Sequence, residues 1–156
     1  DFHFYDDAKE SLLRTRIAGF INVVVSNQPD LATGLLLERT LEEMNLKMIE
    51  ALAVDEVYIC PHVSKDNCNC RKPKPGMILD IAAELGADVR NAVFFGDTDS
   101  DAAAARAAGV AAFHLILGGK RTAEEALQTK YFPTPPDGIY PDLLSAVTSL
   151  LQISNR

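Results

Sequence analysis

The chain has 156 residues, of which 47% are hydrophobic, and its 15 basic and 22 acidic side chains give a formal net charge of −7. This composition predicts one globular domain over residues 1–156. A domain of this length buries roughly 68–70% of the surface that its unfolded chain exposes, so it does not need disulfides to fold. The acidic balance excludes non-specific binding to nucleic acid or to an anionic membrane, and no apolar run approaches the roughly 18 residues of a membrane span. We therefore expect a soluble, cytoplasmic protein.

Apolar residues at helical spacing alternate along the chain with short apolar runs. The first helix is predicted over residues 6–18, with Asp6 or Asp7 as its cap and Gly19 at its end, and a strand over 21–25 follows. The pattern then repeats, with helices predicted over 37–51, 76–85, 102–108, 123–128 (weak) and 142–151, and strands over 57–59, 92–95 and 110–117. Strands that are apolar on both faces and alternate with helices predict an α/β fold with a mostly parallel sheet.

Polar side chains follow three of the predicted strands. Ser26-Asn27-Gln28 follows the first strand, a polar loop that reaches Arg71-Lys72 follows the second, and Gly96-Asp97 follows the third. Because ligands bind outside the carboxyl ends of the strands in open α/β sheets, these residues are predicted to meet at one edge of the sheet.

All three cysteines fall in one short segment, which reads C-x-H, a five-residue spacer, then C-x-C. The four candidate ligands are Cys60, His62, Cys68 and Cys70. Four thiolate and imidazole ligands match a tetrahedral zinc site with no open position, so the predicted zinc is structural. The alternative is a reduced loop that binds no metal, and a disulfide is less plausible because the chain has no secretory features.

The residues after this loop favour a phosphorylated ligand and a second metal. Arg71 and Lys72 directly follow the last candidate zinc ligand, and a guanidinium and an ammonium suit phosphate oxygens. Asp97 is predicted to bind Mg²⁺, which prefers oxygen ligands, with Asp101 in reach of the same site. The alternative is that Asp99 and Asp101 only cap the next helix and complement its dipole, and we expect this of Asp99.

Ser26 carries the weakest signal, because a hydroxyl that follows a strand often only caps a turn. Its functional interpretation is as a phosphate ligand, together with backbone N–H groups of the loop that follows. Gly34 is expected to let that loop turn tightly.

Together these residues resemble the haloacid dehalogenase (HAD) superfamily of phosphohydrolases. The resemblance is closest to its zinc-containing branch, which includes phosphatases of histidinol phosphate and of D-glycero-D-manno-heptose 1,7-bisphosphate. Val23-Val24-Val25-Ser26-Asn27-Gln28 resembles the second motif of that branch, and Phe95-Gly96-Asp97-Thr98-Asp99-Ser100-Asp101 resembles the fourth. The segment from Cys60-Pro61-His62 to Cys68-Asn69-Cys70-Arg71-Lys72-Pro73 resembles the zinc loop joined to the third-motif Lys, and it is the most specific of the three.

The resemblance implies a Rossmann-like three-layer fold and a hydrolase of phosphoric monoesters. In this superfamily a first-motif Asp attacks phosphorus to give an aspartyl-phosphate, and a second Asp acts as general acid and base. By resemblance, Ser26, Asn27 and Lys72 hold the phosphate and Arg71 contacts the substrate. Asp97 binds Mg²⁺ with support from Asp101. The expected partner is a small phosphorylated metabolite, bound by a monomer or small homo-oligomer.

The first motif, an apolar strand that ends in D-x-D, has no counterpart here, and Asp6-Asp7-Ala8 is the nearest candidate. Since the sequence begins at Asp1 without Met, the preferred interpretation is an N-terminally incomplete phosphatase. The alternative is a catalytically inactive relative that keeps its zinc loop and only binds a phosphorylated ligand. A receiver domain of the response-regulator type ranks last, because it has no use for the zinc loop.

The substrate is predicted from the segments that flank the motifs. The short spacer between His62 and Cys68 is similar to that of histidinol-phosphatases, whereas Lys72-Pro73-Lys74-Pro75-Gly76-Met77 is more similar to the heptose type. Thr33 stands where the heptose type has Arg. The preferred prediction is a heptose bisphosphate, and histidinol phosphate is the alternative.

Overall fold

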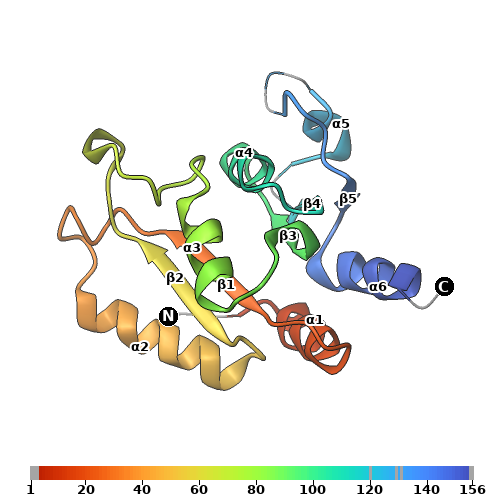
Figure 1. Ribbon diagram of the computed structural model, residues 1–156, viewed down its shortest axis with the longest axis horizontal. Helices are drawn as coiled ribbons and strands as arrows, with labels where there is room; N and C mark the ends of the chain where they lie inside the picture. The colour runs from red at the N-terminus through yellow and green to blue at the C-terminus, as the bar shows by residue number, and fades with distance from the viewer. Residues whose placement is uncertain (1–3, 120, 129, 131, 155–156) are drawn as a thin grey trace. The chain divides into compact units, whose positions relative to one another are not determined.

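The computed structural model describes residues 4–119, 121–128, 130 and 132–154, which form two compact units. The first unit holds the residues up to Cys68 and those from Val147 onward, and the second is Asn69–Ala146. Each unit contains a parallel sheet, with β1 and β2 in the first and β3, β4 and β5 in the second (Figure 1). The predicted α/β class and the parallel pairing are confirmed, but the described strands form two sheets where one was predicted. None of the described helices is long and apolar enough to cross a membrane.

The first unit alternates helices and strands in the predicted order. Its elements are α1 (Asp6–Ile17), β1 (Val23–Asn27), α2 (Glu38–Ala51), β2 (Glu56–Cys60) and a short 3₁₀ turn (Ser64–Asp66). The two strands pair in parallel, with Val23 opposite Glu56 and Asn27 opposite Cys60. The carboxyl end of β1 therefore lies beside the residue at which the predicted metal loop begins.

The side chain of Asn22 fixes the entry into β1. It is 7% exposed, and its amide donates to the carbonyls of Leu12 at 2.7 Å and Ala53 at 2.6 Å. Its oxygen accepts from the hydroxyl of Thr15 at 2.7 Å, and its backbone N–H donates to the Asp55 carboxylate at 2.8 Å. Because a buried amide is costly without partners, this network holds the end of α1 and the starts of both strands together.

The second unit, Asn69–Ala146, contains the remaining strands and most of the remaining helices. Its elements are α3 (Gly76–Glu84), a 3₁₀ turn (Val89–Asn91), β3 (Val93–Gly96), α4 (Asp99–Ala108), β4 (Ala112–Ile116), α5 (Ala123–Ala126) and β5 (Gly138–Tyr140), and α6 (Leu143–Ser154) begins here and ends in the first unit. β4 lies between β3 and β5. Phe113 and Leu115 of β4 are fully buried, as are Ala104 and Ala105 of α4. The small alanine side chains allow α4 to lie close to β4 and α3, and so fix the loop between β3 and α4.

Several predicted boundaries were wrong. β1 starts at Val23 and includes Ser26 and Asn27, because pairing with β2 continues to Cys60. Tyr5 occupies the cap position of α1, so Asp6 and Asp7 lie in the first turn and provide no cap. α4 begins at Asp99, three residues earlier than predicted.

The short strand β5 was not predicted. It has only three residues after a proline-rich connection, and it forms by pairing Gly138 with His114 of β4. Such a segment is too short to show the alternation from which strands are recognised in a sequence.

His114 of β4 is an ionisable residue among aromatic rings. Its ring centroid lies 5.6 Å from that of Phe95 and 5.5 Å from that of Tyr140. Its Nδ1 atom is buried and has no hydrogen-bond partner among the described residues. Burial lowers the pKa of His114, Asp137 opposes this shift, and Arg106 adds to it. The folded unit therefore disfavours the charged imidazolium.

This environment predicts a loss of stability in mild acid. As the pH falls below about 6.5, the unfolded chain takes up the His114 proton first, so the free energy of unfolding decreases until the folded pKa is passed. We expect His114→Leu to remove this part of the pH dependence, as measured by urea denaturation between pH 7.5 and 5. An unchanged slope in the variant contradicts this assignment.

Candidate functional site

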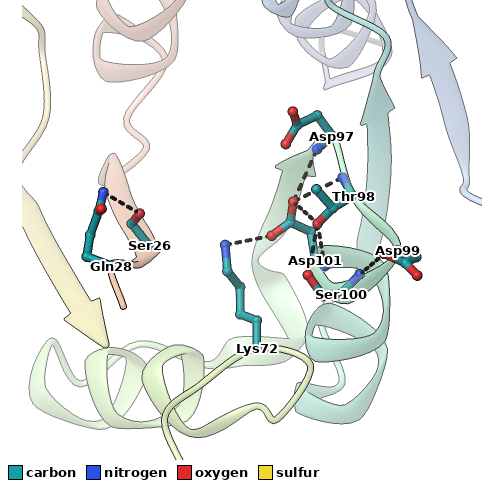
Figure 2. A network of polar contacts seen from close by, with 8 residues as sticks. All are labelled: Ser26, Gln28, Lys72, Asp97, Thr98, Asp99, Ser100 and Asp101. Atoms are coloured by element: carbon teal, nitrogen blue, oxygen red, sulfur yellow. Dashed lines mark hydrogen bonds and ion pairs between the residues drawn. The ribbon is translucent and has the colours of Figure 1, made fainter. Parts of the chain in front are cut away.

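Lys72 and Asp101 form an ion pair in the second unit. Their Nζ and Oδ1 atoms lie 2.6 Å apart, and the two side chains are 13% and 6% exposed (Figure 2). The contact pairs an ammonium with a carboxylate, so the attraction is electrostatic. A charge pair this far from solvent is weakly screened, and losing either partner leaves the other charge poorly compensated.

The second carboxylate oxygen of Asp101 is held by three donors. Oδ2 accepts from the hydroxyl of Thr98 at 2.7 Å, from the N–H of Thr98 at 3.1 Å and from the N–H of Asp97 at 3.2 Å. The Thr98 hydroxyl in turn accepts from the N–H of Asp101 at 3.1 Å, which completes a capping box at the start of α4. Asp101 therefore joins Lys72 to the turn after β3.

Asp97 occupies the first position after β3. Its backbone N–H is bound to Asp101, while its carboxylate points away from the Asp101 carboxylate (Figure 2). The protein donors around Asp101 make Asp97 the stronger candidate for direct metal binding. The role of Asp101 as a supporting metal ligand stays a prediction.

The helix cap was assigned to the wrong residue. Thr98 caps α4, whereas Asp99 is its first helical residue, and the Asp99 carboxylate accepts from the N–H of Ser100 at 2.9 Å. The signal was present in the sequence, because Thr98-x-x-Asp101 has the form of a capping box in which Asp replaces Glu.

We expect Thr98→Val to lower the free energy of unfolding by about 1 kcal/mol, the usual cost of losing a helix cap. The valine keeps the shape of threonine but removes the hydroxyl that binds Asp101. Chemical denaturation measures the change. Thr122→Val is a matched control, because Thr122 caps the short helix α5 with the same box. A Thr98→Val protein as stable as the wild type contradicts the role of this cap.

Ser26 and Asn27 lie at the carboxyl end of β1 in the first unit. The side-chain amide of Gln28 donates to the Ser26 hydroxyl at 3.3 Å, and the backbone N–H of Gln28 donates to the carbonyl of Cys60 at 2.8 Å. Gly34 has a φ of +73°, so the tight turn predicted there is confirmed. That Ser26 meets Lys72 at a common phosphate stays a prediction.

The four predicted zinc ligands lie close together at the end of β2 and in the loop that follows it. Their ligand atoms all lie within 4.8 Å of one another, and the residues are Cys60, His62, Cys68 and Cys70. The Cys60 sulfur lies 3.7 Å from the Cys68 sulfur and 3.6 Å from Nδ1 of His62.

These separations fit a tetrahedral zinc ion. With Zn–S bonds of about 2.3 Å and a Zn–N bond of about 2.0 Å, tetrahedral geometry places two sulfurs about 3.8 Å apart and a sulfur and a nitrogen about 3.5 Å apart. The residues are therefore compatible in type, number and spacing with a closed, structural zinc site. Whether the protein binds zinc stays a prediction.

The comparisons with known proteins agree with the fold. A family model described as HAD-hydrolase-like matches residues 69–146, which is the second unit. The chain is 35% identical over 143 residues to a D-glycero-beta-D-manno-heptose-1,7-bisphosphate 7-phosphatase of Vibrio cholerae, covering 83% of this chain and 77% of the relative. It is 34% identical over 151 residues to the phosphatase of the same name from Pseudomonas aeruginosa, with coverages of 92% and 80%.

A solved structure is similar along nearly the whole chain. It is the D,D-heptose 1,7-bisphosphate phosphatase of B. bronchiseptica, crystallised with magnesium and phosphate. The TM-score is 0.81 at 32% sequence identity, and the match covers 96% of this chain and 84% of that one. The third and fourth motifs predicted from the sequence both lie in the unit that the family model matches. The chain therefore belongs to the HAD-like hydrolase family.

Proposed function

We propose that this protein is a phosphomonoester hydrolase that acts on a small sugar bisphosphate. The observation that carries the proposal is the Lys72–Asp101 contact, which ties the residue of the third motif to the turn that begins with Asp97. A buried cation fixed beside a carboxylate-bearing strand end suits a phosphate group that also needs a divalent cation. The family membership of the chain supports the same reaction class.

The proposed roles follow from the chemistry of each side chain. Lys72 holds a phosphate oxygen and offsets negative charge as the bond to phosphorus changes, and Ser26 and Asn27 bind the remaining oxygens. Arg71 contacts the substrate next to Lys72. Asp97 is the proposed Mg²⁺ ligand, and bound Mg²⁺ supplies charge neutralisation at the phosphate. Magnesium in the similar B. bronchiseptica phosphatase supports this choice of metal.

The zinc cluster is proposed to be structural. Three sulfurs and one imidazole fill a tetrahedral shell, so no position is left for a reacting water. Its thiolates require a reducing compartment, which is why we place the protein in the cytoplasm.

D-glycero-D-manno-heptose 1,7-bisphosphate is the proposed substrate, because the phosphatases similar to this chain carry that name. The test is to assay the full-length protein with Mg²⁺ for phosphate release from the heptose bisphosphate and from histidinol phosphate. We expect release from the first and little from the second. Turnover of histidinol phosphate alone assigns the alternative substrate. Binding of both compounds without release of phosphate identifies the inactive relative and contradicts the proposal.

A further inference from the structure

Two glycines near the Lys72–Asp101 ion pair in the chain, Gly76 and Gly96, have neighbouring atoms where a side chain would begin. Most glycines of the chain have a positive φ and open space where a side chain begins, as is usual in turns: Gly19, Gly34, Gly86, Gly109, Gly118 and Gly119. Gly76 and Gly96 differ, because neither has a positive φ and both face atoms closer than 3 Å to the position of a Cβ. Close approach of neighbouring groups, and not backbone conformation, explains these two glycines.

Gly76 brings the end of the metal loop onto the first residue of α3. Its N–H donates to the carbonyl of Asn69 at 3.1 Å. A Cβ at this position would lie 2.3 Å from the Asn69 oxygen, 2.7 Å from the Asn69 carbonyl carbon and 3.0 Å from Cα of Cys70. These are backbone atoms, so any side chain at position 76 forces the loop away from the helix. Helix propensity alone favours alanine over glycine, and so does not explain Gly76.

Lys72 lies inside the turn that this contact closes. The hydrogen bond between Gly76 and Asn69 encloses a second one, in which the N–H of Lys74 donates to the carbonyl of Arg71 at 2.9 Å. Lys72 therefore lies within both hydrogen-bonded turns, the one from Asn69 to Gly76 and the shorter one from Arg71 to Lys74. Moving Asn69 away from Gly76 therefore moves the base of the Lys72 side chain.

Gly96 provides the space for the partner carboxylate. A Cβ at position 96 would lie 2.6 Å from Cβ of Asp101 and 2.9 Å from both its Cγ and its Oδ2. That oxygen is the one held by Thr98 and Asp97. A methyl group at position 96 therefore displaces Asp101 from its three donors and from the Lys72 ammonium.

We propose that Gly76 and Gly96 are positioning residues that together set the Lys72 ammonium and the Asp101 carboxylate in the geometry that phosphate binding needs. The inference rests on the proposed function, because it takes Lys72 as a phosphate ligand. Lysine has a long, flexible side chain and makes no bidentate contact, so its position depends on what surrounds it. Misplacing such a group by about 1 Å can cost a hundredfold in rate.

The test measures binding of inorganic phosphate to the full-length protein with Mg²⁺, by calorimetry. We expect Gly76→Ala and Gly96→Ala each to raise the Kd for phosphate about tenfold or more. Gly138→Ala is the matched control, because its Cβ would meet Tyr140 at 2.6 Å and His114 at 2.7 Å, away from the ion pair. It should lower the melting temperature and leave the Kd within about twofold.

A double-mutant cycle separates positioning from a general loss of structure. In a protein that already carries Lys72→Met, adding Gly76→Ala should change the Kd by less than about twofold, because the residue it positions is gone. An equal loss with and without Lys72 overturns the proposal, and so does an unchanged Kd in folded glycine variants. Should Gly76→Ala fail to fold, Gly96→Ala is tested in the same cycle. If neither folds, the glycines serve the fold and the proposal is overturned.

The binding and the turnover measurements test the two proposals separately. A wild-type protein that binds phosphate but releases none from the heptose bisphosphate contradicts the proposed function. The phosphate titrations of the glycine variants still decide the role of Gly76 and Gly96.

Discussion

Replacing Lys72 with methionine is expected to lower kcat/KM for the sugar bisphosphate by about 10²–10³-fold, the usual effect of removing one preorganised electrostatic contact to a reacting group. The Nζ atom of Lys72 lies 2.6 Å from Oδ1 of Asp101, and the Lys72 side chain is only 13% exposed. Methionine keeps most of the volume of the side chain but carries no charge. The loss should therefore reflect the missing ammonium more than a packing defect.

The same replacement should also lower stability. Asp101 keeps its three donors from Thr98 and Asp97 but loses its cationic partner at 6% exposure. We expect the free energy of unfolding to fall by about 1–3 kcal/mol, as for other hydrogen-bonded charges that lose one partner. Urea denaturation without substrate measures this separately from the kinetics.

Lys65→Met is the matched control for Lys72→Met. Lys65 is an exposed lysine of the metal loop, so its replacement changes the net charge equally. We expect its kcat/KM to stay within about twofold of the wild type, because exposed charges contribute little at physiological salt. A Lys72→Met enzyme as active as this control excludes Lys72 as a phosphate ligand.

Element bounds were predicted accurately where the deciding signal is local, and less accurately where it is not. α2 and α3 begin and end within a residue of their predicted bounds, because apolar periodicity and the Pro75-Gly76 start signal act locally. β1 was predicted two residues too early. Its extent depends on pairing with β2, and the sequence of β1 alone carries no signal for that pairing. The three residues of β5 depend on β4 in the same way.

In the candidate site, the types of the functional residues could be predicted from the sequence, whereas the contacts between them could not. Residue types alone indicated Lys72, Asp97 and the zinc ligands, because few side chains can bind phosphate or metal ions. The sequence did not predict the contact between Lys72 and Asp101, which are 29 positions apart and are joined only by the fold. Nor did it predict Gly76 and Gly96, because a glycine that admits a neighbouring group looks like any other glycine until the neighbour is known.

Removing zinc is expected to unfold the loop over residues 60–70 and to weaken phosphate binding with it. The loop is mostly polar, five of its eleven residues are exposed and five are half-buried, and of its candidate ligands only Cys60 is fully buried. Packing therefore contributes little to its shape, and four metal bonds would contribute most of it. Its first residue pairs with Asn27, and its last precedes Arg71 and Lys72. Loss of the metal should thus disturb both groups of proposed phosphate ligands.

Cys68→Ser tests this without a chelator, which would also remove Mg²⁺. We expect the wild-type protein to hold about one zinc per chain by elemental analysis and the variant to hold much less. The variant should melt several degrees lower, exchange its amide hydrogens faster over residues 60–70 and bind phosphate more weakly at saturating Mg²⁺. Ser64→Ala, a change at an exposed position of the same loop, should alter none of these. Zinc-free wild-type protein that binds phosphate normally would show that the cluster neither needs metal nor supports Lys72.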